Sequence, residues 1–120
     1  MPIKSMDPLT LKRQLDEGNA VLIDVREPHE HAREHIEGAK LVPLSRFQAE
    51  TFPGLHDKVA VFHCHSGGRT TANAELLASK GFRDSYQLGG GIVAWKAAGL
   101  PTRSTQAPEG EGRRKLFGLF

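Results

Sequence analysis

Short apolar runs alternate with amphipathic stretches along most of the 120-residue chain. Residues 20–23 and 59–62 are apolar without alternation, as strands buried on both faces are, and the second of these strands is expected to reach His63. Residues 41–43 and 85–88 are two further extended pieces. Helices are predicted over residues 8–17, from Pro28 onward, and over 44–52, 71–80 and 92–98. Strands that alternate with helices at this spacing predict an α/β domain with a parallel sheet and helices on both faces.

The first predicted helix carries clear boundary signals. Asp7 stands at an N-cap position and Pro8 at the first helical position, while Leu11 and Leu15 are one helical turn apart. Gly18 then ends the helix. The last predicted helix carries Trp95, which we expect to pack in the core.

The single cysteine, Cys64, directly follows the buried run at residues 59–63 and directly precedes a helical pattern. It begins the segment Cys64-His65-Ser66-Gly67-Gly68-Arg69-Thr70. A strand, a glycine-bearing loop and a helix start bring backbone N–H groups together around an anion, which favours thiolate over thiol. Gly67 and Gly68 are expected to permit special backbone angles and close approach, and Arg69 supplies a permanent cation for an oxyanion.

This loop resembles the active-site loop of the rhodanese-type sulfurtransferases, and three further segments extend the resemblance in the same order along the chain. They are Leu22-Ile23-Asp24-Val25-Arg26-Glu27, His35-Ile36-Glu37-Gly38-Ala39, and Leu88-Gly89-Gly90-Gly91-Ile92-Val93-Ala94-Trp95 followed by Gly99-Leu100-Pro101. The chain departs from the family pattern at His65, where Arg is frequent, and at Gly68, where a polar residue is common. These departures bear on substrate preference and leave the role of Cys64 unchanged.

The resemblance implies a rhodanese-like fold over residues 5–102 and a sulfur relay on Cys64. A thiolate attacks the sulfane sulfur of thiosulfate or a related donor, and a nucleophilic acceptor then removes that sulfur. Cyanide, a small thiol and a sulfur-carrier protein are the candidate acceptors, and no cofactor is implied. His65, Ser66, Gly67, Gly68, Arg69 and Thr70 are the expected substrate-binding residues.

Asp24 and Arg26 follow the first buried run and are expected at the same sheet edge as Cys64. We favour a supporting ion pair or loop cap over direct catalysis. His29, His31 and His35 invite a metal hypothesis, but they lack a supporting carboxylate and cysteine frame at a recognised ligand spacing. No metal site is therefore predicted.

Composition and charge narrow the functional classes. Residues 1–102 carry 12 Lys and Arg against 12 Asp and Glu, so the basic footprint of a nucleic-acid-binding domain is missing. One cysteine allows no internal disulfide, and the first residues contain no apolar signal segment, so a cytoplasmic location is expected. The resemblance extends to single rhodanese domains of small membrane proteins, but no stretch here approaches the about 20 apolar residues that span a bilayer.

Residues 103–120 differ in composition and are expected to form a flexible tail. They are rich in polar residues and Gly and end in a basic then apolar segment, Arg113-Arg114-Lys115-Leu116-Phe117-Gly118-Leu119-Phe120. Eight residues are a weak membrane anchor, so membrane contact is the less favoured alternative to a solvated tail.

Two other functions share a reactive Cys64. Cysteine phosphatases also pair His with Cys and end their loop with Arg, but they place five residues between Cys and Arg. Here only His65, Ser66, Gly67 and Gly68 intervene, which favours a sulfur-sized anion. A thiol-based redox or nitrosation sensor, or a binding module, is the non-enzymatic alternative, and only turnover distinguishes it from an enzyme.

Overall fold

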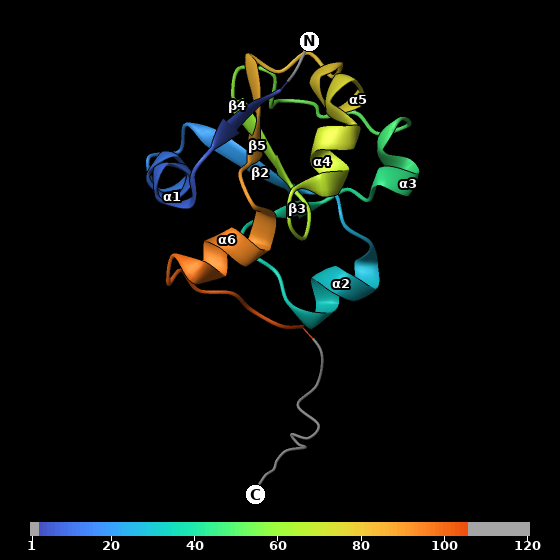
Figure 1. The fold of residues 1–120 in the computed structure, drawn as a ribbon. Coiled ribbons are helices and arrows are strands. Elements are labelled where there is room, and N and C mark those ends of the chain that lie inside the picture. Colours follow the sequence, from blue (N-terminus) through green and yellow to red (C-terminus); the bar gives the residue numbers. More distant parts are fainter. Residues whose placement is uncertain (1–2, 106–120) are drawn as a thin grey trace, which may run out of the picture.

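The computed structural model describes residues 3–105, which form a five-stranded, entirely parallel sheet in the order β1-β5-β4-β2-β3 (Figure 1). The strands are β1 (Lys4–Met6), β2 (Ala20–Asp24), β3 (Lys40–Leu41), β4 (Val59–His63) and β5 (Asp84–Leu88). The helices are α1 (Pro8–Asp16), α2 (Pro28–Arg33), α3 (Leu44–Phe47), α4 (Gly68–Ala72), α5 (Ala74–Ala78) and α6 (Gly91–Ala97). The predicted α/β class and parallel sheet are confirmed.

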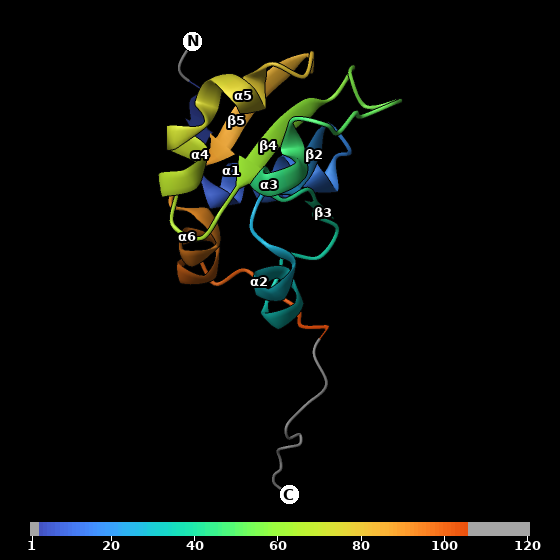
Figure 2. The same ribbon diagram turned by 90° about the vertical axis from the view of Figure 1, so that its right-hand side faces the viewer.

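The sheet separates two apolar clusters, so helices cover both of its faces as predicted (Figures 1 and 2). One cluster contains Phe47 of α3 and Leu77 of α5, and the other contains Leu11 of α1 and Trp95 of α6. Trp95 is fully packed, and its indole N–H donates to the carbonyl of Pro101 at 2.8 Å. The two-sided core explains why the central strands lack polar alternation.

Strand β4 divides its side chains between the two clusters by strict alternation. Ala60 and Phe62 belong to the cluster on the α3 and α5 side, and Val61 belongs to the opposite one. Cys64 continues this alternation and packs with Phe62. The pleat of β4 therefore decides on which side of the sheet the thiol lies.

The first helix follows its sequence signals. Asp7 is the N-cap of α1, and its carboxylate accepts a hydrogen bond from the backbone N–H of Thr10 at 3.3 Å. Pro8 is the first helical residue, and Gly18 after the helix has a φ of 77°, in the left-handed region that favours glycine.

Two predicted helices are shorter than expected. The segment at 71–80 is interrupted at Asn73, whose side-chain amide donates to the carbonyl of Arg69 at 2.8 Å and so competes with the backbone ladder. The segment at 44–52 is helical only over α3, and the N–H groups of Ala49 and Glu50 donate to carbonyls three residues earlier, as in turns. The ammonium group of Lys80 donates to the carbonyls of Gln48 and Glu50 in this turn.

Strand β1 was not predicted. Its three residues pair with β5 at the sheet edge. Because they are exposed or half-buried, the strand does not need apolar residues, and the sequence there contains no apolar run that would predict it. A strand of this length becomes stable only through the backbone ladder that its neighbour offers.

Residues 103–105, the start of the predicted tail, lie against the chain around α2. Arg103 and His35 exchange backbone hydrogen bonds of 2.8 Å each, and the N–H of Thr105 donates to the carbonyl of Ala32 at 2.9 Å. Arg103 also pairs with Glu37 at 3.0 Å. Residues 106–120 lie outside the described part of the chain. No helix within residues 3–105 has the length and apolar character needed to cross a membrane.

These contacts predict that the stable domain extends beyond Thr102. A chain that ends at Thr102 loses three backbone hydrogen bonds, so we expect its free energy of unfolding to fall by about 1–3 kcal/mol. A chain that ends at Thr105 is the matched control, because it keeps all three of these hydrogen bonds. Urea denaturation followed by circular dichroism measures the difference, and equal midpoints for the two truncated chains would contradict the prediction.

Candidate active site

The cysteine loop begins where the central strand β4 ends. Strand β2 lies directly beside β4, and Asp24, the last residue of β2, is in register with His63, the last residue of β4. The chain continues from β2 outward to β3 and then returns to β4 on the other side of β2. Such a change of direction opens a crevice at the carboxyl ends of the strands, where α/β proteins bind ligands.

The loop folds back so that its own groups surround the sulfur of Cys64. The N–H of Gly67 donates to Sγ at 3.1 Å, and the hydroxyl of Thr70 lies 3.9 Å from Sγ. Cys64 is only 1% exposed, whereas His65, Ser66 and Gly68 are exposed. The thiol is therefore held beneath a loop whose outer residues face solvent.

The loop favours the ionised form of the thiol. Burial by itself raises the pKa of Cys64, but hydrogen bonds from the backbone N–H groups of Thr70, Gly67 and Arg69 and from the Thr70 hydroxyl outweigh burial and lower it. A lowered thiol pKa increases the thiolate fraction at neutral pH, and the thiolate is the nucleophilic form.

Gly67 and Gly68 differ in what the loop requires of them. Gly67 donates its N–H to the sulfur and has a φ of 106°, which side chains rarely adopt, so the chain can turn from the loop into α4 directly after this contact. Gly68 has no positive φ, and a Cβ there would meet nothing within 4 Å. The backbone freedom predicted for both glycines is needed only at Gly67.

Helix α6 supports the loop from the side. The N–H of Ile92 donates to the carbonyl of Cys64 and that of Val93 to the carbonyl of His65, each at 3.1 Å. This approach requires glycine at position 91, because a Cβ there would overlap the carbonyl of His65 and lie 2.7 Å from that of Cys64. The sequence singled out Gly91 only as part of a motif, and the structure gives it a packing role.

Asp24 and Arg26 form a buried frame under the site. Both carboxylate oxygens of Asp24 accept hydrogen bonds from the Arg26 guanidinium, at 3.0 and 2.8 Å. Arg26 also donates to the carbonyl of Glu34 at 2.7 Å, which ties the end of α2 to the sheet. Burial by itself raises the pKa of Asp24, but the hydrogen bonds from Arg26 help to lower it below its ordinary value.

His63 completes this buried group and was not among the predicted site residues. Its Nδ1–H donates to the carbonyl of Cys64 at 3.1 Å, and its Nε2 lies 3.7 Å from the Asp24 carboxylate. Burial lowers the pKa of His63, so the neutral ring is favoured. Its position immediately before Cys64 on an apolar strand was the sequence signal for a buried histidine.

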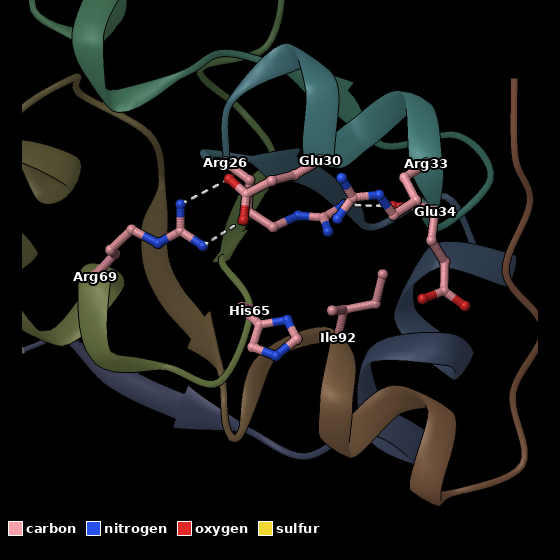
Figure 3. A pocket seen from close by; sticks show the side chains of 7 residues that line it. All are labelled: Arg26, Glu30, Arg33, Glu34, His65, Arg69 and Ile92. Carbon is pink, nitrogen blue, oxygen red and sulfur yellow. Dashed lines mark hydrogen bonds and ion pairs between the residues drawn. The ribbon is translucent and has the colours of Figure 1, made fainter. Parts of the chain in front are cut away.

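A pocket of about 300 Å³ opens beside the loop (Figure 3). It is lined by Arg26, Glu30, Arg33, Glu34, His65, Arg69 and Ile92. Cys64 is not among the lining residues, but its loop neighbours His65 and Arg69 are. A small anion in this pocket would meet side chains of the loop, of α2 and of the start of α6.

Arg69 does not point freely into this pocket. Its Nη1 and Nη2 each donate to one carboxylate oxygen of Glu30 at 2.9 Å, which makes a two-pronged ion pair between α4 and α2 (Figure 3). The hydrogen bond from Arg69 lowers the pKa of Glu30 to about 2. Sequence reasoning missed Glu30, whose signal was its place three residues after Glu27, at the start of the helix that begins at Pro28.

Thr70 links the sulfur to a second residue that the sequence did not identify. The Thr70 hydroxyl lies 2.6 Å from the side-chain oxygen of Gln87 on β5, and Thr71 donates to the same oxygen at 3.1 Å. Because Thr70 has a single hydroxyl proton, Gln87, the carbonyl of Gly67 at 3.1 Å and the sulfur of Cys64 compete for it.

His31 and His35 stack ring against ring, with centroids 4.1 Å apart. Nδ1 of His35 bonds to the carbonyl of His31 at 2.8 Å. Within residues 3–105, no three His, Cys, Asp or Glu side chains gather in a way that could hold a metal ion.

The contacts of Thr70 generate a test of thiolate stabilisation. Thr70→Val keeps the shape of the side chain but removes its hydroxyl, so the pKa of Cys64 should rise. Thr71→Val is the matched control, because Thr71 also binds Gln87 but does not contact Cys64. The rate of alkylation by iodoacetamide against pH measures the thiol pKa. Indistinguishable curves for Thr70→Val and the unmodified protein would contradict this role.

Comparison with known proteins places this geometry in a family. A rhodanese-like domain profile matches residues 7–98. The rhodanese-like domain of an Anabaena protein superposes with a TM-score of 0.73 at 26% identity, over 100% of this chain and 94% of that one. A rhodanese-related protein of Thermoplasma volcanium gives a TM-score of 0.71 at 27% identity, over 86% and 99% of the two chains.

Curated relatives include proteins named for sulfur transfer. A sulfurtransferase of Allochromatium vinosum is 31% identical over 90% of this chain and 99% of its own length. An uncharacterised protein of Synechocystis and the probable adenylyltransferase/sulfurtransferase MoeZ of Mycobacterium tuberculosis are each 39% identical, over 82% and 76% of this chain. The chain spans about 55% of the former and 24% of the latter. These names support sulfur transfer in general, and the matched residues show that the chain belongs to the rhodanese-like domain family.

Proposed function

We propose that this protein is a sulfurtransferase that carries sulfane sulfur as a persulfide on Cys64. The observation that carries the proposal is the sulfur of Cys64 at the end of β4, where the loop N–H groups lower its pKa. The same loop N–H groups suit the negative charge of a persulfide. The family and the relatives named as sulfurtransferases support this chemistry.

The first half-reaction loads the enzyme. The Cys64 thiolate attacks the outer sulfur of thiosulfate and forms a sulfur–sulfur bond, while the bond between the two thiosulfate sulfurs breaks and its electron pair leaves with sulfite. In the second half-reaction, a nucleophile such as cyanide or a thiolate attacks the outer persulfide sulfur. Thiocyanate or a new persulfide leaves, and the Cys64 thiolate is restored.

The residues around Cys64 have distinct proposed roles. The backbone of residues 65–70 holds the charge of the persulfide, and His65, Ser66 and Gly68 are exposed to an incoming donor. Arg69 provides positive charge at the pocket, and Asp24 and Arg26 act as supporting residues that hold the strand end and α2. No cofactor takes part in either half-reaction.

The donor and acceptor are proposed by chemical class. Thiosulfate is one donor that fits the scheme, and cyanide or a small thiol is a sufficient acceptor. One relative is named for both adenylyl and sulfur transfer, which supports a sulfur-carrier protein as a further candidate acceptor. A thiolate with no second cysteine for protection operates best in a reducing compartment, so we propose the cytoplasm as its location.

Mass spectrometry of the intact protein tests the proposal. After treatment with thiosulfate, we expect the mass of one added sulfur atom, and cyanide should remove it with release of thiocyanate. Cys64→Ser, which keeps the side-chain size but lacks the nucleophile, should show no adduct and should lose at least about 1000-fold in turnover. Undiminished turnover in Cys64→Ser would overturn the proposal.

Two further results, one from a separate phosphatase assay and one from the same mass spectra, would assign Cys64 to another function. Hydrolysis of p-nitrophenyl phosphate that depends on Cys64 would assign the loop to phosphate-ester chemistry, although it has one residue fewer between Cys64 and Arg69 than that chemistry uses. A Cys64 adduct that no acceptor removes would indicate a thiol-based sensor or binding module.

A further inference from the structure

The positive charges of the pocket are mostly neutralised from within the protein. Arg26 is bound to the Asp24 carboxylate, and Arg69 to the Glu30 carboxylate. Arg33 is the one lining cation that forms no ion pair within residues 3–105. A dianionic donor therefore meets a pocket in which the loop cation already has an anionic partner.

Glu30 is firmly held in its position. Besides Arg69, its carboxylate accepts a hydrogen bond of 2.9 Å from the backbone N–H of Glu27, the residue before α2. Helix α2 is in turn tied to the sheet by the bond from Arg26 to the carbonyl of Glu34. The Glu30 side chain is 23% exposed and that of Arg69 is 39% exposed. The pair is thus part of the pocket wall and is still accessible to a ligand.

The contact between Glu30 and Arg69 uses the groups that an oxyanion would need. A carboxylate takes the two terminal nitrogens of the guanidinium, and the sulfonate end of thiosulfate would bind through the same parallel N–H groups. Binding of thiosulfate to this face of Arg69 must therefore displace Glu30 or accept its repulsion at close range. The cost rises with the negative charge of the donor.

We propose that Glu30 is a specificity-determining residue, whose carboxylate competes with anionic sulfur donors for the guanidinium of Arg69 and so favours donors of lower negative charge. This inference rests on the proposed sulfur transfer through Cys64. It assigns to the site a donor class of monoanionic or uncharged sulfane-sulfur compounds, and it makes dianionic thiosulfate a weakly bound donor.

Two donors that differ in charge provide the kinetic test. Thiosulfate carries two negative charges, and methanethiosulfonate carries one. Both give their outer sulfur to a thiolate, with sulfite or methanesulfinate as the leaving group. Glu30→Gln removes the charge but keeps an oxygen that can accept the N–H of Glu27, so the start of α2 is preserved.

We expect Glu30→Gln to lower the KM for thiosulfate about 1.5- to 5-fold, the range that corresponds to loss of a partly exposed ion pair. The KM for methanethiosulfonate should fall less than half as much, and kcat for both donors should stay within about twofold, because Glu30 does not contact the sulfur of Cys64. An equal effect on the two donors, or no decrease in the KM for thiosulfate, would overturn the proposal.

Glu34→Gln is the matched control for net charge. Glu34 lines the same pocket and loses the same charge, but its ion-pair partner is Lys96 at 2.9 Å instead of Arg69. For Glu34→Gln, the KM for thiosulfate should decrease by less than half as much as it does for Glu30→Gln. In an Arg69→Ala background, Glu30→Gln should have no larger effect than Glu34→Gln, and a persistent larger effect would show that Glu30 does not act through Arg69.

A binding measurement separates this inference from the proposed function. Titration calorimetry of thiosulfate into Cys64→Ser needs no sulfur transfer, and adding Glu30→Gln should lower the dissociation constant for thiosulfate. No tightening, including no binding to either protein, would overturn the specificity role. Failure of the proposed function shows instead as the absence of a sulfur adduct on Cys64, whatever the calorimetry gives.

Discussion

The site depends on two backbone hydrogen bonds that helix α6 donates to the carbonyls of Cys64 and His65. They fix the path of the chain as it leaves β4, and the loop can then turn the N–H of Gly67 onto the sulfur. The bonds form only because position 91 has no side chain, since a Cβ would overlap the loop carbonyls. Contacts between residues 28 positions apart in the sequence thus control the environment of the thiol.

A second constraint acts from the opposite side of the crevice. The buried pair of Asp24 and Arg26 fixes the end of β2, and Arg26 reaches onward to the last turn of α2. Burying such a pair is costly unless its hydrogen bonds are satisfied, and here several are. The position of α2 brings Glu30 to Arg69. The charge balance of the pocket therefore depends on the structural ion pair between Asp24 and Arg26, which holds α2 in place.

The two constraints give the thiol and the pocket different electrostatic characters. Around Cys64, backbone N–H groups converge and favour negative charge. In the pocket beside it, carboxylates offset most of the positive side chains. The attraction for anions is therefore concentrated at the thiol loop and does not extend over the whole pocket. Under the proposed function, such a site would stabilise the thiolate and its persulfide without binding every oxyanion that diffuses into it.

Local sequence patterns were sufficient to predict the α/β class, the parallel sheet with helices on both faces, and the place of Cys64 at a strand end. These features arise from local patterns: continuous apolar runs in β2 and β4, the Asp7 and Pro8 signals of α1, and a contiguous cysteine loop. Each pattern is contained within a few residues, so its physical consequence can be inferred without knowing what packs against it.

The other features of the fold and the site could not be predicted, because each of them depends on contacts between groups that are distant in the sequence. The sequence gives no sign that Arg69 has an anionic partner. Glu30, 39 positions away, becomes its partner only when the fold brings α2 and α4 together. The break at Asn73, the edge strand β1 and the contacts of residues 103–105 likewise follow from bonds that compete with or supplement local preference. Periodicity fixes which face of a segment is buried, whereas charge pairing across a crevice is fixed only when the segments meet.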